Sequence, residues 1–189
     1  EPSRLAGWLS PVVATAAVLA IGLVLFGAMG KDPWQALYVF FIEPVDTLYD
    51  LGELLLKASP IMLCAVGLAV GYRANVWNIG AEGQFLMGAW GASAVVLFPI
   101  VPPGTPSIIT VPLMMVAGMA AGAAYGAIPG LLKAVRGVNE IIVTLMLNYI
   151  ALLWISYWVF GPWSEGGFQL TPQFPREAWL PRLSDFADQ

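Results

Sequence analysis

The sequence contains no histidine and a single cysteine, Cys64, among its 189 residues. A disulfide needs two cysteines, and zinc centres and Ser-His-Asp triads draw on cysteine or histidine. A disulfide-stapled fold, a zinc site and a histidine-based catalytic triad are therefore excluded. Cys64 stands in an apolar run, so we expect it to be an inert packing residue. We expect neither a metal site nor a catalytic residue in this chain.

Charged residues are also scarce. They make up 11% of the sequence, whereas a water-soluble domain carries about a quarter. Eight Lys and Arg stand against twelve Asp and Glu, and no basic stretch alternates with aromatics, so nucleic acid is excluded as a partner. Residues 8–29 and 85–132 contain no charge at all, and 59% of the chain is hydrophobic. The expected solvent is a lipid bilayer.

Hydropathy predicts an all-α membrane protein, a polytopic transmembrane helix bundle with about five spans. A bilayer core needs roughly 20 apolar residues in a helix, because lipid cannot satisfy free backbone groups. The segments that approach this length are 8–29, 54–72, 83–101, 108–132 and 141–160. They form one transmembrane domain over 1–189. We expect this domain to be truncated, because the chain opens on Glu1 and stops in a proline-rich stretch.

The connecting segments differ in character. Residues 34–42 are aromatic and apolar but only half a membrane long, which is typical of an interfacial helix. An acidic loop is expected to follow, with Glu43, Asp46, Asp50 and Glu53. Prolines and mixed charges predict an extramembrane loop over 161–189. Three tryptophans near its start are typical of an interfacial aromatic belt: Trp154, Trp158 and Trp163.

Lys and Arg in short loops indicate the orientation, because such loops stay in the cytoplasm. With five spans, four of these residues fall on one side: Arg4, Arg73, Lys133 and Arg136. The other side also holds Lys31, Lys57, Arg176 and Arg182, although Lys57 lies within the predicted span 54–72 and not in a loop, so the bias is moderate. It predicts a cytoplasmic N-terminus and an extracytoplasmic segment 161–189.

Glycines recur every fourth residue in the fourth predicted span, at Gly118, Gly122, Gly126 and Gly130. This spacing places them on one side of a helix, where small residues let another helix approach closely. The pattern predicts a helix-packing seam, and it also fits a sliding surface for a moving helix. Pro129 near the end is expected to kink this helix.

A polar cluster over 73–84 joins the second and third predicted spans, and it is too polar to face lipid. Asn78 is predicted to cap the third helix, with Glu82 in its first turn near the positive end of the helix dipole. Glu82 and Gln84 lie close to membrane depth, where ionisable groups are costly. Two interpretations fit Asn78, Glu82 and Gln84: helix capping, or pathway lining and subunit contact.

A second polar cluster, 133–140, precedes the fifth predicted span. Asn139 is predicted to cap that helix, with Glu140 in its first turn. Thr144 and Asn148 follow one turn apart on one face, inside the bilayer, so their polar groups need partners. Asn148 fits either a substrate contact or an interhelical hydrogen bond. These four residues also remain candidates for pathway lining or subunit contact.

The sequence contains no GxxxxGK[ST] motif, so it cannot cradle nucleotide phosphates in the usual way, and any ATP hydrolysis must belong to a partner. Three segments resemble the permeases of bacterial ABC importers for nucleosides and simple sugars. They are LKASPI at 56–61, YRANVWNIGAEGQ at 72–84 and GVNEIIVTLMLNY at 137–149. The wider group includes ribose-type and branched-chain amino-acid permeases, and within it residues 78–84 and 138–144 look most similar to the nucleoside branch.

The resemblance implies the N-terminal half of a permease that is not itself an enzyme. It implies a bacterial inner-membrane location and alternating access. The expected partners are a second permease subunit, ABC subunits that bind ATP and Mg, and an extracytoplasmic substrate-binding protein. The family's cytoplasmic coupling helix has no match here. The alternative is an ion-coupled secondary transporter or channel. Paired carboxylates at mid-membrane would favour it, because such a protein needs its own site for the coupling ion. Glu82 and Glu140 are instead expected near the cytoplasmic ends of helices.

Overall fold

The computed structural model describes residues 4–180, and every regular element in that range is a helix. The longer helices are α1 (Arg4–Ala28), α2 (Pro33–Phe41), α3 (Leu48–Arg73), α4 (Ala81–Leu97), α5 (Ser107–Arg136) and α6 (Glu140–Phe160). Two 3-10 turns are η1 (Glu43–Val45) and η2 (Arg176–Ala178). The predicted all-α class is confirmed. The end of the predicted loop, 181–189, lies outside the described residues.

A helix stands at each of the five predicted spans, and four of these helices are long and apolar enough to cross a membrane. Their apolar side chains point outward, as at Val24 (70% exposed) and Leu63 (74%). Exposed apolar surface of this extent suits lipid as the solvent. α4, with 17 residues, is shorter than the others.

The predicted end of the third span, Val101, is wrong, because α4 ends at Leu97. The apolar run continues through Phe98 and Val101 but contains Pro99. Proline disfavours the helical conformation of the residue before it, and it cannot donate the next helical hydrogen bond. Hydrophobicity thus extends past the point where the backbone can remain helical.

The predicted acidic loop is also wrong in its second half, because α3 begins at Leu48 and includes Asp50 and Glu53. The reason is a local cap, in which the backbone N–H of Asp50 donates to Thr47 Oγ1 at 3.1 Å. A Thr-x-x-Asp sequence before an apolar run is a helix-start signal. The four residues from Thr47 to Asp50 therefore indicate, from the sequence alone, that a helix begins here.

The chain divides into two compact units, Glu1–Leu63 and Cys64–Gln189. In the first unit α2 confirms the short helix predicted between the first two spans. Asp32 caps it by accepting from the backbone N–H groups of Trp34 and Gln35, at 2.9 and 3.4 Å. The hydroxyl of Tyr38 donates to Asp46 Oδ2 at 3.0 Å, and this hydrogen bond raises the pKa of Tyr38.

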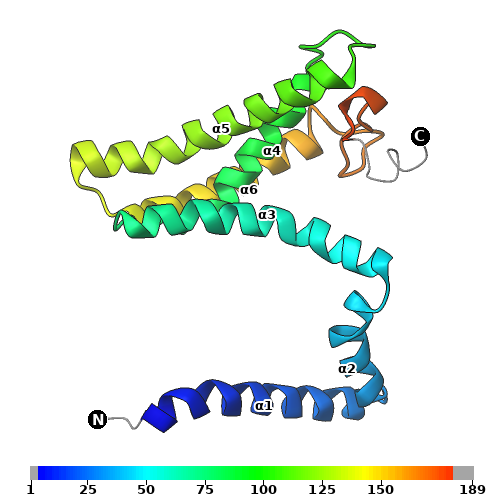
Figure 1. Ribbon diagram of the computed structural model, residues 1–189. Coiled ribbons are helices and arrows are strands. Elements are labelled where there is room, and N and C mark those ends of the chain that lie inside the picture. The colour runs from blue at the N-terminus through cyan, green and yellow to red at the C-terminus, as the bar shows by residue number, and fades with distance from the viewer. Residues whose placement is uncertain (1–3, 181–189) are drawn as a thin grey trace. The chain divides into compact units, whose positions relative to one another are not determined.

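In the second unit α4 packs against both α5 and α6 (Figure 1). Gly88 of α4 lies against Gly118 and Gly122 of α5, while Gly83 lies against Asn148 and Ala151 of α6. Gln84 of α4 contacts Gly126 of α5, whereas Gly88, later in α4, contacts the earlier Gly118, so α5 is antiparallel to α4. Gly83 contacts Asn148 of α6 and the later Trp90 contacts the later Trp154, so α6 is parallel to α4. The α3–α4 and α5–α6 connections consequently share one end, and the α4–α5 loop lies at the other.

Candidate functional site: a polar junction at one end of α4 and α6

One face of α6 carries three polar side chains, Glu140, Thr144 and Asn148. Their spacing of four residues aligns them along the helix. This polar face lies against the non-helical segment 74–80 that precedes α4. A segment without helical hydrogen bonds leaves backbone groups that need partners inside a membrane protein.

The first two side chains of the face each accept a backbone hydrogen bond from this segment. The N–H of Trp77 donates to Glu140 Oε1 at 3.4 Å, and the N–H of Ile79 donates to Thr144 Oγ1 at 3.2 Å. Thr144 is 2% exposed, so its hydroxyl forms this hydrogen bond away from solvent. The backbone of the segment is thus held by α6 side chains.

Asn148 uses both ends of its amide. Its Oδ1 accepts from the N–H of Gly83 at 2.8 Å, and its Nδ2 donates to the carbonyl of Ile79 at 3.0 Å. Gly83 lies in the first turn of α4, where backbone N–H groups have no partner within the helix. Asn148 therefore caps α4 from a neighbouring helix. Of its two sequence interpretations, this geometry corresponds to the interhelical hydrogen bond.

The prediction that Asn78 caps α4 is wrong. The capping position is Gly80, which has no side chain, and Asn78 Oδ1 accepts from the N–H of Gly80 at 2.8 Å. Asn78 closes a tight turn one step before the helix, as asparagine side chains commonly do. Its Nδ2 donates to Gln84 Oε1 at 3.0 Å, which joins two of the predicted site residues.

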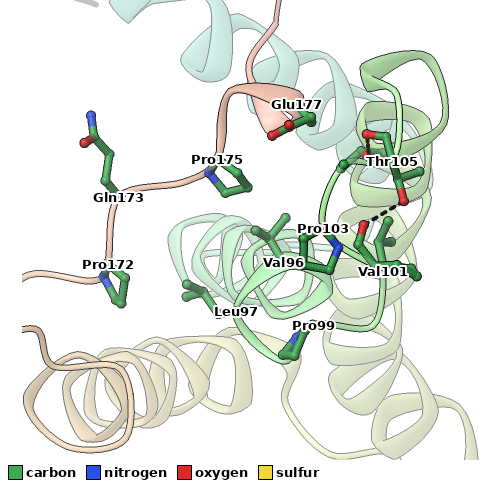
Figure 2. Close-up of a pocket in the computed structure, with 13 residues that line it drawn as sticks. Val96, Leu97, Pro99, Val101, Pro103, Thr105, Pro172, Gln173, Pro175 and Glu177 are labelled. Atoms are coloured by element: carbon green, nitrogen blue, oxygen red, sulfur yellow. Dashed lines mark hydrogen bonds between the residues drawn. The ribbon is translucent and has the colours of Figure 1, made fainter.

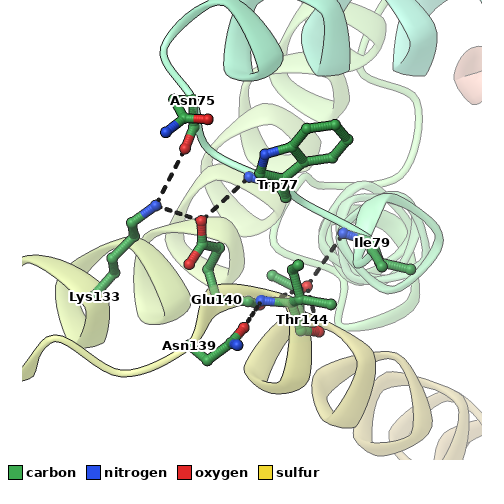
Figure 3. A network of polar contacts seen from close by, with 8 residues as sticks. Asn75, Trp77, Ile79, Lys133, Asn139, Glu140 and Thr144 are labelled. Atoms are coloured by element: carbon green, nitrogen blue, oxygen red, sulfur yellow. Dashed lines mark hydrogen bonds and ion pairs between the residues drawn. The ribbon is translucent and has the colours of Figure 1, made fainter.

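Lys133 ties the junction to α5 (Figure 3). Its ammonium group forms an ion pair with Glu140 and donates to the carbonyl of Asn75 at 3.3 Å. Asn75 has a φ of 56°, a left-handed conformation that asparagine tolerates better than most residues. Asn139 Oδ1 accepts from the N–H of Ile141 at 3.0 Å, so Asn139 caps α6 as predicted.

Glu82 stands apart from these contacts. Its side chain is exposed on the first turn of α4, and no hydrogen bond or ion pair joins it to the other described residues. The structure brings Asn78 and Gln84 together. It brings Glu140, Thr144 and Asn148 to one face of α6, and Asn139 caps that helix from just before its first residue. It leaves Glu82 facing outward.

The glycine-rich face of α5 lies against α4 along most of its length. A methyl group added to Gly118 would lie 3.1 Å from the carbonyl oxygen of Gly88, and one on Gly122 would lie 3.1 Å from that of Gln84. A methyl group on Gly126 would approach the side chain of Gln84 at 3.3 Å. Gly130 differs, because a methyl group there would meet no described atom within 4 Å.

Sequence reasoning missed an aromatic cluster at the opposite end of α4. Trp163 is 6% exposed and stacks on Trp90, with ring centroids 6.0 Å apart. Trp154, Trp158 and Phe98 also belong to this cluster. The belt predicted for Trp163 is wrong, because the chain turns back after α6 and buries this ring. The indole N–H groups of Trp90, Trp158 and Trp163 are buried without an acceptor among the described residues.

A cavity of about 460 Å³ lies at this same end, between the α4–α5 loop and the segment before η2 (Figure 2). Its wall is largely aliphatic and proline-rich, with Val96, Pro103 and Pro175. Glu177 is the charged side chain among its lining residues. No cluster of metal-ligating side chains occurs in the part of the chain that the structure describes.

Comparison with known proteins identifies relatives across most of the chain. The family described as "Branched-chain amino acid transport system / permease component" matches residues 51–182. The glucose ABC transporter permease protein of Haloferax volcanii is 36% identical over 190 aligned positions, covering 97% of this chain and 49% of the relative. No solved structure gave a significant match.

Two further relatives carry nucleoside names. The nucleoside ABC transporter permease protein of Lactococcus lactis is 34% identical, covering 80% of this chain and 41% of the relative. The guanosine ABC transporter permease protein of Bacillus subtilis is 35% identical, covering 82% of this chain and 43% of the relative. The chain therefore spans less than half the length of each of these three curated relatives.

Proposed function

The chain belongs to the permease-component family of branched-chain amino acid transport systems, and on this premise we propose that it forms part of the membrane-spanning permease subunit of an ATP-driven ABC importer. The observation that carries the proposal is the similarity to ABC transporter permeases at 34–36% identity over most of this chain. Its long apolar helices make it a multi-pass membrane protein. The permease itself is a transporter subunit and not an enzyme.

The proposed substrate is a nucleoside or a simple sugar. The names of the relatives support both, because one is a glucose permease and two are nucleoside or guanosine permeases. The two classes share hydroxyl-rich, neutral chemistry, so one permease architecture can serve either.

The proposed partners are a second permease subunit, ATP-binding subunits and an extracytoplasmic substrate-binding protein. ATP and Mg belong to the ATP-binding subunits, because this sequence lacks a phosphate-binding loop. The proposed location is the bacterial inner membrane with the N-terminus in the cytoplasm. The ion pair between Lys133 and Glu140 and the Lys133–Asn75 bond support one shared side for the 73–80 and 133–139 connections.

The proposed mechanism is alternating access, which requires two packings of the helices with different affinities for the solute. The face formed by Gly118, Gly122 and Gly126 supports a close α4–α5 contact within such a bundle. Gly130 lies beyond that contact and is available to a further helix. Among the polar residues, Asn78 and Gln84 are proposed to line the pathway and the exposed Glu82 to contact another subunit.

The remaining candidates, Asn139, Glu140, Thr144 and Asn148, are proposed to act together. Glu140, Thr144 and Asn148 hold the backbone that positions Asn78 and Gln84. Asn139 caps α6, the helix that carries these three side chains. Their contribution to transport is therefore proposed to be one of positioning, through the shape of the junction.

The proposal is tested with the full-length permease, purified through a tag from its native membrane. We expect an ATP-binding subunit and a second permease to co-purify, and we expect vesicles that contain the complex to take up labelled guanosine or glucose. Replacing the phosphate-binding lysine of that ATP-binding subunit should abolish uptake. Uptake that survives this change and follows an ion gradient instead would overturn the proposal in favour of a secondary transporter.

The proposed orientation has a separate test. Alkaline phosphatase is active only outside the cytoplasm, whereas green fluorescent protein is fluorescent when fused on the cytoplasmic side. A phosphatase fused after Gln189 should be active, and a fluorescent protein fused there should be dark. The opposite pair of signals would reverse the orientation without affecting the importer assignment.

A further inference from the structure

A cavity of about 380 Å³ lies between the end of α3, α4 and α5, beside the polar junction. Most of its wall is apolar or small. Two amides, Asn78 and Gln84, provide its polar side chains. The other wall residues that matter for the argument are Cys64, Leu68, Phe85 and Gly126. None of the described residues that line it is charged.

The two amides differ in how many further hydrogen bonds each can still form. Asn78 Oδ1 already accepts from Gly80, and Gln84 Oε1 already accepts from Asn78 Nδ2. An amide nitrogen has two N–H groups. Asn78 has spent one of them, and Gln84 Nε2 has no hydrogen-bond partner among the described residues. Each amide oxygen keeps one free lone pair, so the pair offers three N–H donors and two acceptor positions to the cavity.

Gly126 explains how Gln84 fits at this place. A methyl group on Gly126 would lie 3.3 Å from both Cδ and Nε2 of Gln84, which is tighter than ordinary contact. The absence of a side chain at Gly126 leaves room for the amide between α4 and α5. Two features of the sequence that look unrelated, a packing glycine and a polar residue, thus form one wall of the cavity.

Resting on the proposed function, we propose that this cavity is a solute-binding site on the translocation pathway. It takes a neutral polar solute, whose hydroxyl oxygens, carbonyl oxygens or ring nitrogens accept from the N–H groups of Asn78 and Gln84. Leu68 and Phe85 cover the apolar face of the solute. A charged solute is disfavoured, because an uncompensated charge in such a cavity is costly.

Cys64 provides the test, because it lines the cavity and is the only cysteine of this sequence. The complete importer in membrane vesicles is treated with N-ethylmaleimide during ATP turnover, and alkylation of Cys64 is followed by peptide mass spectrometry. Guanosine and glucose serve as probes. We expect the one that is taken up to slow the alkylation of Cys64 at least threefold, by occupying the cavity, and the other to have no effect.

Two variants of Gln84 separate binding from packing. Gln84→Met removes the N–H donors and the acceptor, whereas Gln84→Glu removes the donors but keeps an oxygen for Asn78. Losing such hydrogen bonds weakens binding about threefold to tenfold. We expect both variants to lose the protection of Cys64 and to slow uptake by a similar factor, while the ATP-binding subunit still co-purifies. Gln35→Met, the same change at an exposed position of α2, should behave as wild type.

The outcomes distinguish this inference from the proposed function. Uptake by the unmodified complex that does not depend on the ATP-binding subunit defeats the proposed function. ATP-dependent uptake without protection of Cys64, or normal uptake by Gln84→Met, overturns the binding site and leaves the importer intact. Should either Gln84 variant fail to assemble, the protection of Cys64 in the unmodified complex decides the question.

Discussion

α4 and α6 meet at both of their ends, but different forces hold the two contacts. At the junction, side chains of Thr144 and Asn148 bond to the backbone before and within the first turn of α4. At the opposite end, Trp90 of α4 packs against Trp158 and Trp163, and their indole N–H groups have no acceptor in the described part of the chain. Directional hydrogen bonds hold the junction, whereas packing of aromatic rings holds the opposite end.

The difference has a consequence for movement. Hydrogen bonds weaken steeply with misalignment, so the junction fixes the register of α6 against the segment before α4. Aromatic packing tolerates several ring orientations of similar energy. A change between two helix packings therefore costs less at the tryptophan cluster, where no hydrogen bond to these indoles has to break. We expect the cluster to repack during transport and the junction to move as a rigid piece.

The largest expected effect comes from separating α4 from α5. This change should disturb both the polar junction and the tryptophan cluster, because α4 contributes to each. A leucine in Gly122→Leu would overlap the backbone of α4 around Gln84, because even a methyl group lies 3.1 Å from that carbonyl. We expect the yield of assembled permease to fall to background in size-exclusion chromatography. Gly52→Leu is the matched control and should assemble normally, since Gly52 is an exposed helical glycine where a methyl group meets no described atom within 4 Å. Normal assembly of both variants would refute the packing role of Gly122.

Deleting the most buried ring should break the aromatic end. Trp163→Ala is expected to lower the free energy of unfolding by about 3–5 kcal/mol, measured by denaturation in mixed micelles. Trp163→Phe should cost only about 1 kcal/mol, because it keeps a ring and loses an N–H group that has no acceptor among the described residues. A large loss in the phenylalanine variant would show that the indole N–H is in fact bonded, and the contrast between the two ends would then fail.

Removing the amide that caps α4 should break the junction. Asn148→Leu keeps the size of the side chain but leaves the N–H of Gly83 and the carbonyl of Ile79 without their partner. The expected loss in unfolding free energy is about 1–3 kcal/mol. Ser156→Ala on the same helix is the control, because the bond of Ser156 among the described residues is to the carbonyl of Leu152 within α6. Equal, small effects of the two changes would mean that Asn148 does not hold α4.

The ion pair at the edge of the junction should matter least. Lys133 is 36% exposed, so water screens its attraction to Glu140. Lys133→Met is therefore expected to cost about 1 kcal/mol or less, and the cost should shrink further as salt is added. The comparison of unfolding free energies at low and high salt checks this. A larger, salt-independent loss would indicate that the hydrogen bond to Asn75 is the stronger of the two contacts of Lys133.

Much of the fold could be predicted from the sequence, because its signals are local. The length of each apolar run was enough to predict a helix at each span. The Asn139 cap was predictable because its partner, the N–H of Ile141, lies two residues later in the sequence. Local signals that were overlooked account for two wrong boundaries: Pro99 after α4 and the Thr47–Asp50 cap before α3. Both errors concern residues within a few positions of the boundary.

The candidate site was predictable as a set of residues but not as an arrangement. Polarity within apolar surroundings was enough to single out Asn78, Gln84, Thr144 and Asn148. Their pairing was not, because the cap of α4 comes from a side chain 65 residues further along the chain. Nothing near Asn78 in the sequence indicates that another asparagine, Asn148, provides the hydrogen bond to the first turn of α4. The same holds for Trp163 in the turn after α6, whose partner Trp90 lies on α4.

By itself the sequence determined the solvent, the helical class and the permease family of this protein, because hydrophobic length and short motifs act over neighbouring residues. Only the tertiary structure decided which backbone groups the buried polar side chains satisfy, and which rings lose contact with lipid. A group removed from water must find a partner wherever the folded chain offers one. That choice depends on which helices lie side by side, and no local pattern records it.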